Sequence, residues 1–271
     1  MAMDIRLDNI YNIDCIEGMK CIDADSIDCV VTSPPYDNMR TYDGVADGWN
    51  FEKFQQIAQQ LYRVMKEGGM VAWVVADATI DGSETGSSFR QALYFKEVGF
   101  NLVDTMIYKK HGTPPIGSTK WYFNCFEYIF ILSKGKMREC NLIRDVPARQ
   151  DTYKQTRKRP DGTVREIIHK NEYHTKRRTN IWEYGVGNNL STKDKYAFKH
   201  PAIFPEKLAH DLIYTMTNEG DVVLEPFLGS GTTAKMAIGL HRHYIGFELN
   251  PDYFEIAKKR ISDIKSQPTF F

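Results

Sequence analysis

Two short stretches of the chain combine residue types that could bind and orient a reactive ligand. The first is Ser33-Pro34-Pro35-Tyr36, which follows an apolar run at residues 27–31. Because prolines have a fixed φ and no backbone N–H group, a central strand cannot continue through them. The stretch is therefore either a strand that simply stops at a stiff turn, or a buried strand whose end presents a hydroxyl, carbonyls and an aromatic ring. Ligands of open α/β sheets bind just beyond such strand ends.

The second stretch is the glycine-rich turn Phe227-Leu228-Gly229-Ser230-Gly231, which joins a predicted strand at 221–225 to a helix beginning near Thr233. Glycines let a ligand approach the backbone closely, and the first turn of a helix offers unpaired N–H groups. The spacing matches neither a dinucleotide fingerprint nor a P-loop. Glu248 ends the next predicted strand, about 20 residues further on, where an acid can bind the two ribose hydroxyls of an adenosine-type ligand.

Apolar periodicity predicts the elements that would position both stretches. Continuous apolar runs such as residues 70–76 are typical of parallel strands covered on both faces. Alternating strands and helices favour an α/β fold with a largely parallel, doubly wound sheet. Strands are expected at 10–14, 27–31, 70–76, 102–108, 128–132, 221–225 and 243–247, and helices at 15–22, 51–65, 89–98, 205–217, 233–238 and 251–264.

Length and composition fit either one large α/β domain or one domain with a sizeable insertion. The 271 residues carry no net charge, and no apolar run approaches the roughly 18 residues of a membrane span. The five cysteines are scattered and form no CxxC pair, which argues against a zinc site or a disulfide framework and suits a reducing cytosol. The N-terminus lacks the features of a signal peptide. We expect a cytoplasmic protein without a metal site.

The charge is unevenly distributed along the chain. Residues 133–180 contain 14 Lys and Arg against 6 acids, so the remainder carries the opposite net charge. Charge runs are usually solvated surface loops. Here the length, the excess of cations and the interleaved aromatics Tyr153, Tyr173, Trp182 and Tyr184 favour a nucleic-acid surface, since cations that neutralise phosphates release counterions. We therefore expect this basic segment to face a nucleic acid.

Together, Ser33-Pro34-Pro35-Tyr36 and Phe227-Leu228-Gly229-Ser230-Gly231 resemble the two signatures of DNA amino-methyltransferases, (D/N/S)PP(Y/F) and FxGxG. The catalytic motif precedes the cofactor motif, as in the circularly permuted β class of that family. The resemblance implies a Rossmann-like fold, S-adenosylmethionine as cofactor, double-stranded DNA as partner and a homodimer. It divides the chain into a catalytic half at 1–132, a target-recognition insertion at 133–190 and a cofactor-binding half at 191–271.

The resemblance also implies roles for individual residues. Ser33, Pro34, Pro35 and Tyr36 would form the catalytic motif, with acceptors at Ser33 and the Pro34 carbonyl holding the target amino group and Tyr36 stacking on a flipped-out base. The implied cofactor-binding residues are Asp14, His200, Pro201, Phe204, Glu225, Phe227, Gly229, Ser230, Gly231, Thr232, Thr233 and Glu248. The candidates for DNA contacts are Arg40, Tyr42, Lys154, Arg157, Lys158, Arg159, Arg177 and Arg178.

Some questions stay open at this point. Glu225 stands where the family more often has aspartate, which leaves its contact with the methionine ammonium in doubt. Serine at position 33 is more common in N4-cytosine enzymes, but the β class contains many N6-adenine enzymes, so the target base is undecided. Methylation of RNA or of a protein glutamine, and an inactive DNA-binding regulator, are the alternatives.

Overall fold

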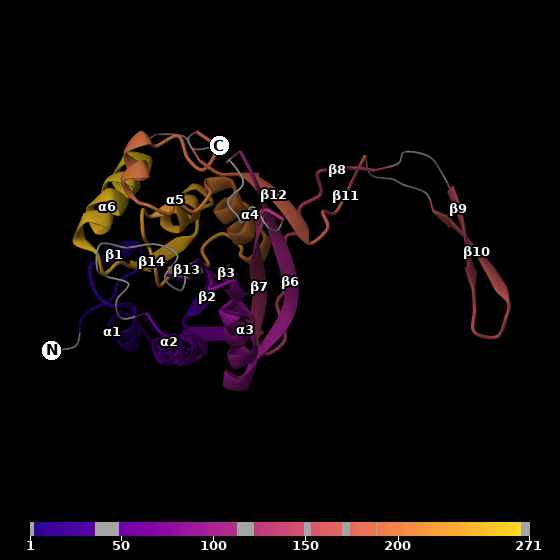
Figure 1. Ribbon diagram of the computed structural model, residues 1–271, viewed down its shortest axis with the longest axis horizontal. Coiled ribbons are helices and arrows are strands. Elements are labelled where there is room, and N and C mark those ends of the chain that lie inside the picture. The colour runs from indigo at the N-terminus through magenta and orange to yellow at the C-terminus, as the bar shows by residue number, and fades with distance from the viewer. Residues whose placement is uncertain are drawn as a thin grey trace. The chain divides into compact units, whose positions relative to one another are not determined.

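The computed structural model describes residues 3–35, 49–112, 122–148, 153–169, 174–187 and 189–266 (Figure 1). Two compact units can be distinguished. The larger comprises Met1–Asn141 and Asn180–Phe271, and the smaller is Leu142–Thr179. In the part of the chain that the structure describes, no helix is both long and apolar enough to cross a membrane.

An eight-stranded sheet forms the centre of the larger unit (Figure 1). In spatial order its strands are β1 (Asn9–Tyr11), β14 (His243–Phe247), β13 (Val222–Glu225), β2 (Ile27–Thr32), β3 (Met65–Val75), β7 (Phe126–Lys134), β6 (Phe100–His111) and β12 (Ile181–Gly185). Of these eight, β7 alone runs antiparallel to its neighbours, and all other pairs are parallel. This sheet confirms the expected α/β, Rossmann-like fold.

Among the described residues, six α-helices flank the sheet in two groups. Helices α1 (Cys15–Lys20), α2 (Phe51–Val64) and α3 (Ser87–Val98) form one group, and α4 (Glu206–Met216), α5 (Thr232–Gly239) and α6 (Pro251–Lys265) form the other. Figure 1 shows the two groups on opposite faces of the sheet. A short 3-10 helix, Lys195–Lys199, precedes α4. Coverage on both faces explains why every residue of β2 is buried.

Helix α2 shows how the sequence pattern produces the packing. The Asn50 side chain accepts a hydrogen bond from the Lys53 amide at 2.8 Å and caps the first turn. The apolar residues of the helix recur on one face, and that face is buried against the sheet. Phe54 is fully buried and meets Trp73 of β3 and Phe95 of α3 edge-on, with ring centroids 5.7 and 5.1 Å away.

The sheet edge corrects one sequence interpretation. Trp182 and Tyr184 belong to β12, which pairs in parallel with β6, and their side chains are buried. They alternate with exposed neighbours because the outer face of this edge strand is solvated. The two aromatics therefore stabilise the edge of the sheet, and their interpretation as part of a nucleic-acid surface was wrong.

The smaller unit contains two short antiparallel pairs. Strands β8 (Val146–Pro147) and β11 (Thr175–Lys176) form one, and β9 (Tyr153–Lys158) and β10 (Val164–His169) form the other. The β9–β10 hairpin closes through Pro160-Asp161-Gly162. Gly162 has a φ of +81°, and the Asp161 side chain accepts from the Thr163 amide at 2.9 Å. Proline, aspartate and glycine in this order favour such a turn, and they fix the register of the two strands.

Candidate active site

The ends of β2 and β13 bring the two sequence motifs together. The strands are parallel neighbours, with Cys29 opposite Val223 and Val30 opposite Leu224. Ser33 follows β2, and the turn at 227–231 follows β13, so both leave the sheet at the same carboxyl edge. The strand order also makes this a junction between two halves of the sheet, which is where open α/β folds bind ligands.

Glu225 links these two strand ends. Its carboxylate accepts a short hydrogen bond from the Thr32 hydroxyl, one at 2.8 Å from the Thr233 hydroxyl and one at 3.0 Å from the Phe227 amide. The Thr233 hydroxyl also lies 3.2 Å from the Val31 carbonyl. A carboxylate has about four acceptor positions, so one remains for a further donor. Glu225 therefore ties the residue before Ser33 to the glycine-rich turn.

Burial makes Glu225 an unusual acid. It is 5% exposed, and loss of hydration raises the pKa of its carboxyl to about 8, although the bonds from Thr32, Thr233 and Phe227 favour the ionised form. The nearby Glu248 carboxylate also raises this pKa. A cation placed beside Glu225 would reverse the effect, because an opposite charge favours ionisation. The carboxyl is thus suited to receive an ammonium group.

The raised pKa predicts a pH-dependent stability difference between the wild type and Glu225→Gln. The folded protein retains the Glu225 proton where the unfolded chain has lost it, so this contribution is present below about pH 4.5 and disappears as pH rises through about 8. Wild type should lose up to about 1.4 kcal/mol per pH unit relative to the variant across this window. Denaturant unfolding at several pH values measures the difference, and a constant difference would contradict the assignment.

The glycine-rich turn is closely packed against the chain around it. Gly231 has a φ of +82°, and a Cβ there would lie 2.9 Å from the Ala257 Cβ of α6. Gly229 has a φ of +52°, and its Cβ would lie 3.0 Å from Nε2 of His200. The His200 ring in turn accepts from the Ala202 amide and lies 4.3 Å from the Tyr253 ring. Both glycines therefore adopt a backbone conformation that other residues rarely adopt, and at Gly231 the helix α6 also leaves no room for a Cβ.

Gly231→Ala is expected to cost more stability than its conformation alone explains. Gly220 has a similar φ of +80° but no atom within 4 Å of its Cβ position, so Gly220→Ala measures the conformational cost, about 1–2 kcal/mol. The clash with Ala257 should add about 1–3 kcal/mol in Gly231→Ala. Denaturant unfolding of the two variants compares these costs, and equal losses would show that α6 accommodates the methyl group freely.

Glu248 lies beside the turn, directly after β14. Its two carboxylate oxygens accept from the Gly229 amide at 2.7 Å and from the Asn250 amide at 2.8 Å. Burial raises the pKa of this carboxyl, and the two amides oppose that shift. Each oxygen retains a further acceptor position for a hydroxyl. The geometry thus holds a carboxylate rigidly at the end of the strand next to β13.

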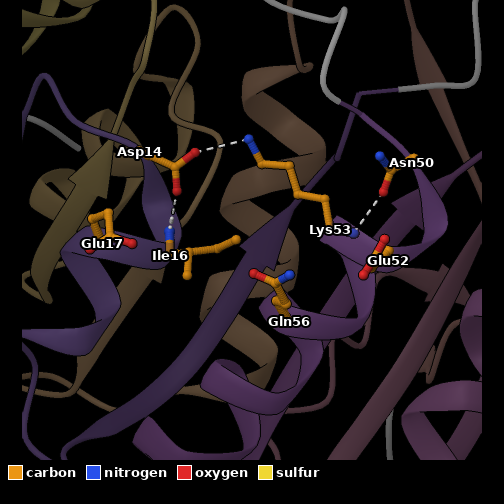
Figure 2. Close-up of a pocket in the computed structure, with 7 residues that line it drawn as sticks. All are labelled: Asp14, Ile16, Glu17, Asn50, Glu52, Lys53 and Gln56. Carbon is orange, nitrogen blue, oxygen red and sulfur yellow. Dashed lines mark hydrogen bonds and ion pairs between the residues drawn. The ribbon is translucent and has the colours of Figure 1, made fainter.

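A pocket of about 350 Å³ lies near the end of β1, between the first turns of α1 and α2 (Figure 2). Asp14 caps α1 through the Ile16 amide at 2.8 Å and forms an ion pair with Lys53 at 2.9 Å. Its pKa is lowered: burial alone would raise it, but the bonds from Lys53 and Ile16 outweigh burial. Asn12 connects this region to Glu248 by donating to the Glu248 carbonyl at 2.8 Å. The lining residues are Asp14, Ile16, Glu17, Asn50, Glu52, Lys53 and Gln56.

An ionic network around the buried Arg260 supports the turn, and the sequence interpretation missed it. Arg260 of α6 is fully buried and donates to the Ser230 carbonyl at 2.8 Å and to the Thr232 hydroxyl at 2.9 Å. It also pairs with Asp194 at 2.8 Å and with Glu206 at 2.6 Å, and Lys235 pairs with the same two acids. The available signal was an arginine on the apolar stripe of a helix.

The structure does not bring every predicted site residue to this edge. Tyr36, Arg40 and Tyr42 lie outside the described residues. Pro201 and Phe204 lie in the segment between His200 and α4. The predicted DNA contacts Lys154, Arg157, Lys158, Arg159, Arg177 and Arg178 belong to the smaller unit.

Two of these cations already have acidic partners. Lys154 lies 3.4 Å from Glu166 across the hairpin, and Nε of Arg178 lies 2.9 Å from Asp145. Arg157, Lys158, Arg159 and Arg177 are exposed.

Comparison with known proteins decides the family of this chain. A family model described as DNA methylase matches residues 27–259, which includes both Ser33-Pro34-Pro35 and the glycine-rich turn. The chain belongs to this DNA methylase family. The family includes N6-adenine and N4-cytosine methylases, as the two motifs led us to expect.

Individual relatives agree with the family assignment. The orphan methyltransferase M.BamHII of Bacillus amyloliquefaciens is 50% identical over 246 residues, covering 88% of this chain and 89% of that protein. Among solved structures, the fold is similar to that of the cytosine-N4-specific PvuII DNA methyltransferase, with a TM-score of 0.70 at 20% identity, covering 94% of this chain and 90% of its own. TTHA0409 of Thermus thermophilus, solved with S-adenosyl-L-methionine, has a TM-score of 0.65 at 25% identity, covering 94% and 93%.

Proposed function

We propose that this chain is a site-specific DNA methyltransferase, which transfers a methyl group from S-adenosylmethionine to the exocyclic amino nitrogen of adenine or cytosine. The observation that carries the proposal is the family match across both motifs. The geometry supports it, because Glu225 joins the strand that precedes Ser33 to the turn that follows β13. M.BamHII, a methyltransferase of similar length, supports the same activity.

The residues present fit S-adenosylmethionine. Glu248 offers carboxylate acceptors for the two ribose hydroxyls, and Glu225 retains one acceptor position for the methionine ammonium. We place the adenine in the pocket lined by Asp14, which has a volume of about 350 Å³ (Figure 2). Asn12, two residues before Asp14, donates to the Glu248 carbonyl and so links this region to the ribose site. Gly229 and Gly231 keep the turn free of side chains, and His200 lies against it.

The cofactor supplies an electrophilic methyl group on a sulfonium, and the protein's task is to orient a poor nucleophile toward it. The lone pair of an exocyclic amino nitrogen is delocalised into the base. Acceptors at Ser33 and at the Pro34 carbonyl would hold its N–H groups and favour a pyramidal nitrogen. Tyr36 would stack on the base, which must leave the duplex to reach the site. Either target base fits these acceptors.

Further parts of the proposal concern assembly and organisation. We expect the circularly permuted order of the β class, with the 1–132 and 191–271 halves forming one domain and residues 133–190 recognising the target. We also expect a homodimer that acts on double-stranded DNA in the cytoplasm. Among the described residues no cluster of His, Cys, Asp or Glu could hold a metal ion. Size-exclusion chromatography with light scattering tests the assembly.

Methyl transfer from labelled cofactor to duplex DNA, RNA and protein, measured side by side, tests the proposed substrate. Label in DNA alone is expected. Label in RNA or in a protein glutamine, but not in DNA, would instead support the alternative enzymes. Calorimetry with the cofactor completes the test, since DNA binding without cofactor binding would indicate an inactive regulator.

A further inference from the structure

We propose that one face of the β9–β10 hairpin reads base edges in the major groove of the target duplex, through Arg157 and Arg165. The inference rests on the proposed function and specifies which surface selects the sequence. The antiparallel register places Arg157 directly opposite Arg165, with Gln155 opposite Ile167 on the same face. Lys154, Thr156 and Lys158 lie on the other face, opposite Ile168, Glu166 and Val164 respectively.

The hairpin has the form of a groove-binding ribbon. Among the described residues, β9 and β10 pair only with each other (Figure 1). All side chains described from 154 to 168 are exposed, except for a half-buried Ile167. The turn at Pro160-Asp161-Gly162 fixes the register, and the register decides which side chains share a face. A two-stranded ribbon fits the width of the major groove, where each base pair presents a distinct pattern of donors and acceptors.

The two faces of the hairpin differ in charge, and this difference indicates which face contacts the base edges. On one face Lys154 lies 3.4 Å from Glu166, so an acid of the hairpin itself partly neutralises the positive charge of this face. On the other, Arg157 and Arg165 stand directly opposite each other, and neither forms an ion pair or hydrogen bond among the described residues. Like charges directly opposite in an antiparallel pair are destabilising. A polyanion between them removes that cost, so this face gains most from entering DNA.

Arginine is also the side chain best suited to read a base pair. Its planar fork donates two hydrogen bonds to O6 and N7 of guanine, which lysine cannot reproduce with the same geometry. A phosphate contact depends mainly on charge and tolerates lysine better. We therefore expect the recognised sequence to contain G·C pairs that Arg157 and Arg165 contact. Lys154 and Lys158 contact phosphates or remain in solvent.

Substitutions between arginine and lysine keep the charge, so they distinguish a residue that contacts bases from one that only neutralises phosphates. The site is first mapped by methylating plasmid DNA in a methylase-free host and sequencing single molecules. The full-length protein and its Arg157→Lys, Arg165→Lys, Lys154→Arg and Lys158→Arg variants then methylate the mapped duplex and all its single-base-pair substitutions. The ratio of kcat/KM between the mapped and substituted duplexes is the discrimination at each position.

We expect Arg157→Lys and Arg165→Lys to lose about 10- to 100-fold discrimination at one or two G·C pairs, with cofactor affinity unchanged. Lys154→Arg and Lys158→Arg should retain the discrimination of the wild type. Unchanged discrimination in both arginine variants would overturn the inference, and so would a loss confined to the lysine variants. If the wild type methylates no duplex, the proposed function fails as well. If the wild type methylates the duplex and both arginine variants keep its discrimination, only the assignment of this hairpin face is overturned.

Discussion

Arg260→Met is expected to lower the free energy of unfolding by about 1–3 kcal/mol, because it removes the fully buried guanidinium that pairs with two half-buried carboxylates. Among the described residues, Asp194 and Glu206 would retain Lys235 as their ion-pair partner. The Ser230 carbonyl and the Thr232 hydroxyl would lose the donor that now fixes the turn. Cofactor affinity of the folded variant should therefore also fall, by about tenfold, since Ser230 and Thr232 flank Gly231.

Arg138→Met is the matched control for this prediction. Arg138 also pairs with two acids, Asp28 and Asp221, but these lie at the amino ends of β2 and β13, away from the glycine-rich turn. This variant should lose stability while its folded form binds the cofactor as the wild type does. Denaturant unfolding and calorimetry at a temperature where both variants are folded make the comparison. Equal cofactor affinities in the two variants would show that Arg260 stabilises the fold without positioning the turn.

Glu248→Gln is expected to weaken cofactor binding by about 10- to 100-fold, the value of a hydrogen-bonded charge. An amide offers only one acceptor oxygen, so its NH2 group would face either the Gly229 or the Asn250 amide, both of which are donors. The same change removes the anionic acceptor proposed for the ribose hydroxyls. At saturating cofactor, turnover should fall much less than affinity, because Glu248 is not assigned a contact with the target base.

Glu127→Gln provides a comparison for Glu248→Gln within the same sheet. Glu127 is a carboxylate of β7 that pairs with Lys110 at 3.0 Å and lies on a strand remote from β14. Its replacement should leave cofactor affinity unchanged. Calorimetric titration of both variants with S-adenosylmethionine provides the measurement. An unchanged affinity in Glu248→Gln would show that the ribose assignment is wrong.

The strands and helices around the site could be predicted from the sequence where burial produces a continuous or periodic pattern of apolar residues. The apolar run at 27–31 predicted β2, whose residues are all buried, and the periodicity at 51–65 predicted α2 to within one residue. Ser33 and the turn at 227–231 were readable because prolines and glycines mark the ends of strands. Their proximity followed from the parallel sheet, since the carboxyl ends of neighbouring strands meet at one edge.

The remaining features depend on contacts that a local pattern does not contain. The β9–β10 hairpin is exposed on both sides, so its strands have no apolar alternation, and only Pro160-Asp161-Gly162 signals the turn. Strand β12 was obscured because Trp182 and Tyr184 stand next to a cationic segment. The network around Arg260 joins residues far apart in the chain, such as Arg260 and Asp194, which no local pattern brings together.

Mass spectrometry of nucleosides tests the central claim most directly. Duplex DNA is incubated with the purified protein and S-adenosylmethionine carrying a labelled methyl group, and is then digested to nucleosides. The account predicts labelled N6-methyladenine or N4-methylcytosine with the wild type, and a large loss of that product with Ser33→Ala at saturating cofactor. Labelled 5-methylcytosine, or DNA without label while the protein binds both DNA and cofactor, would contradict methylation of an exocyclic amino nitrogen.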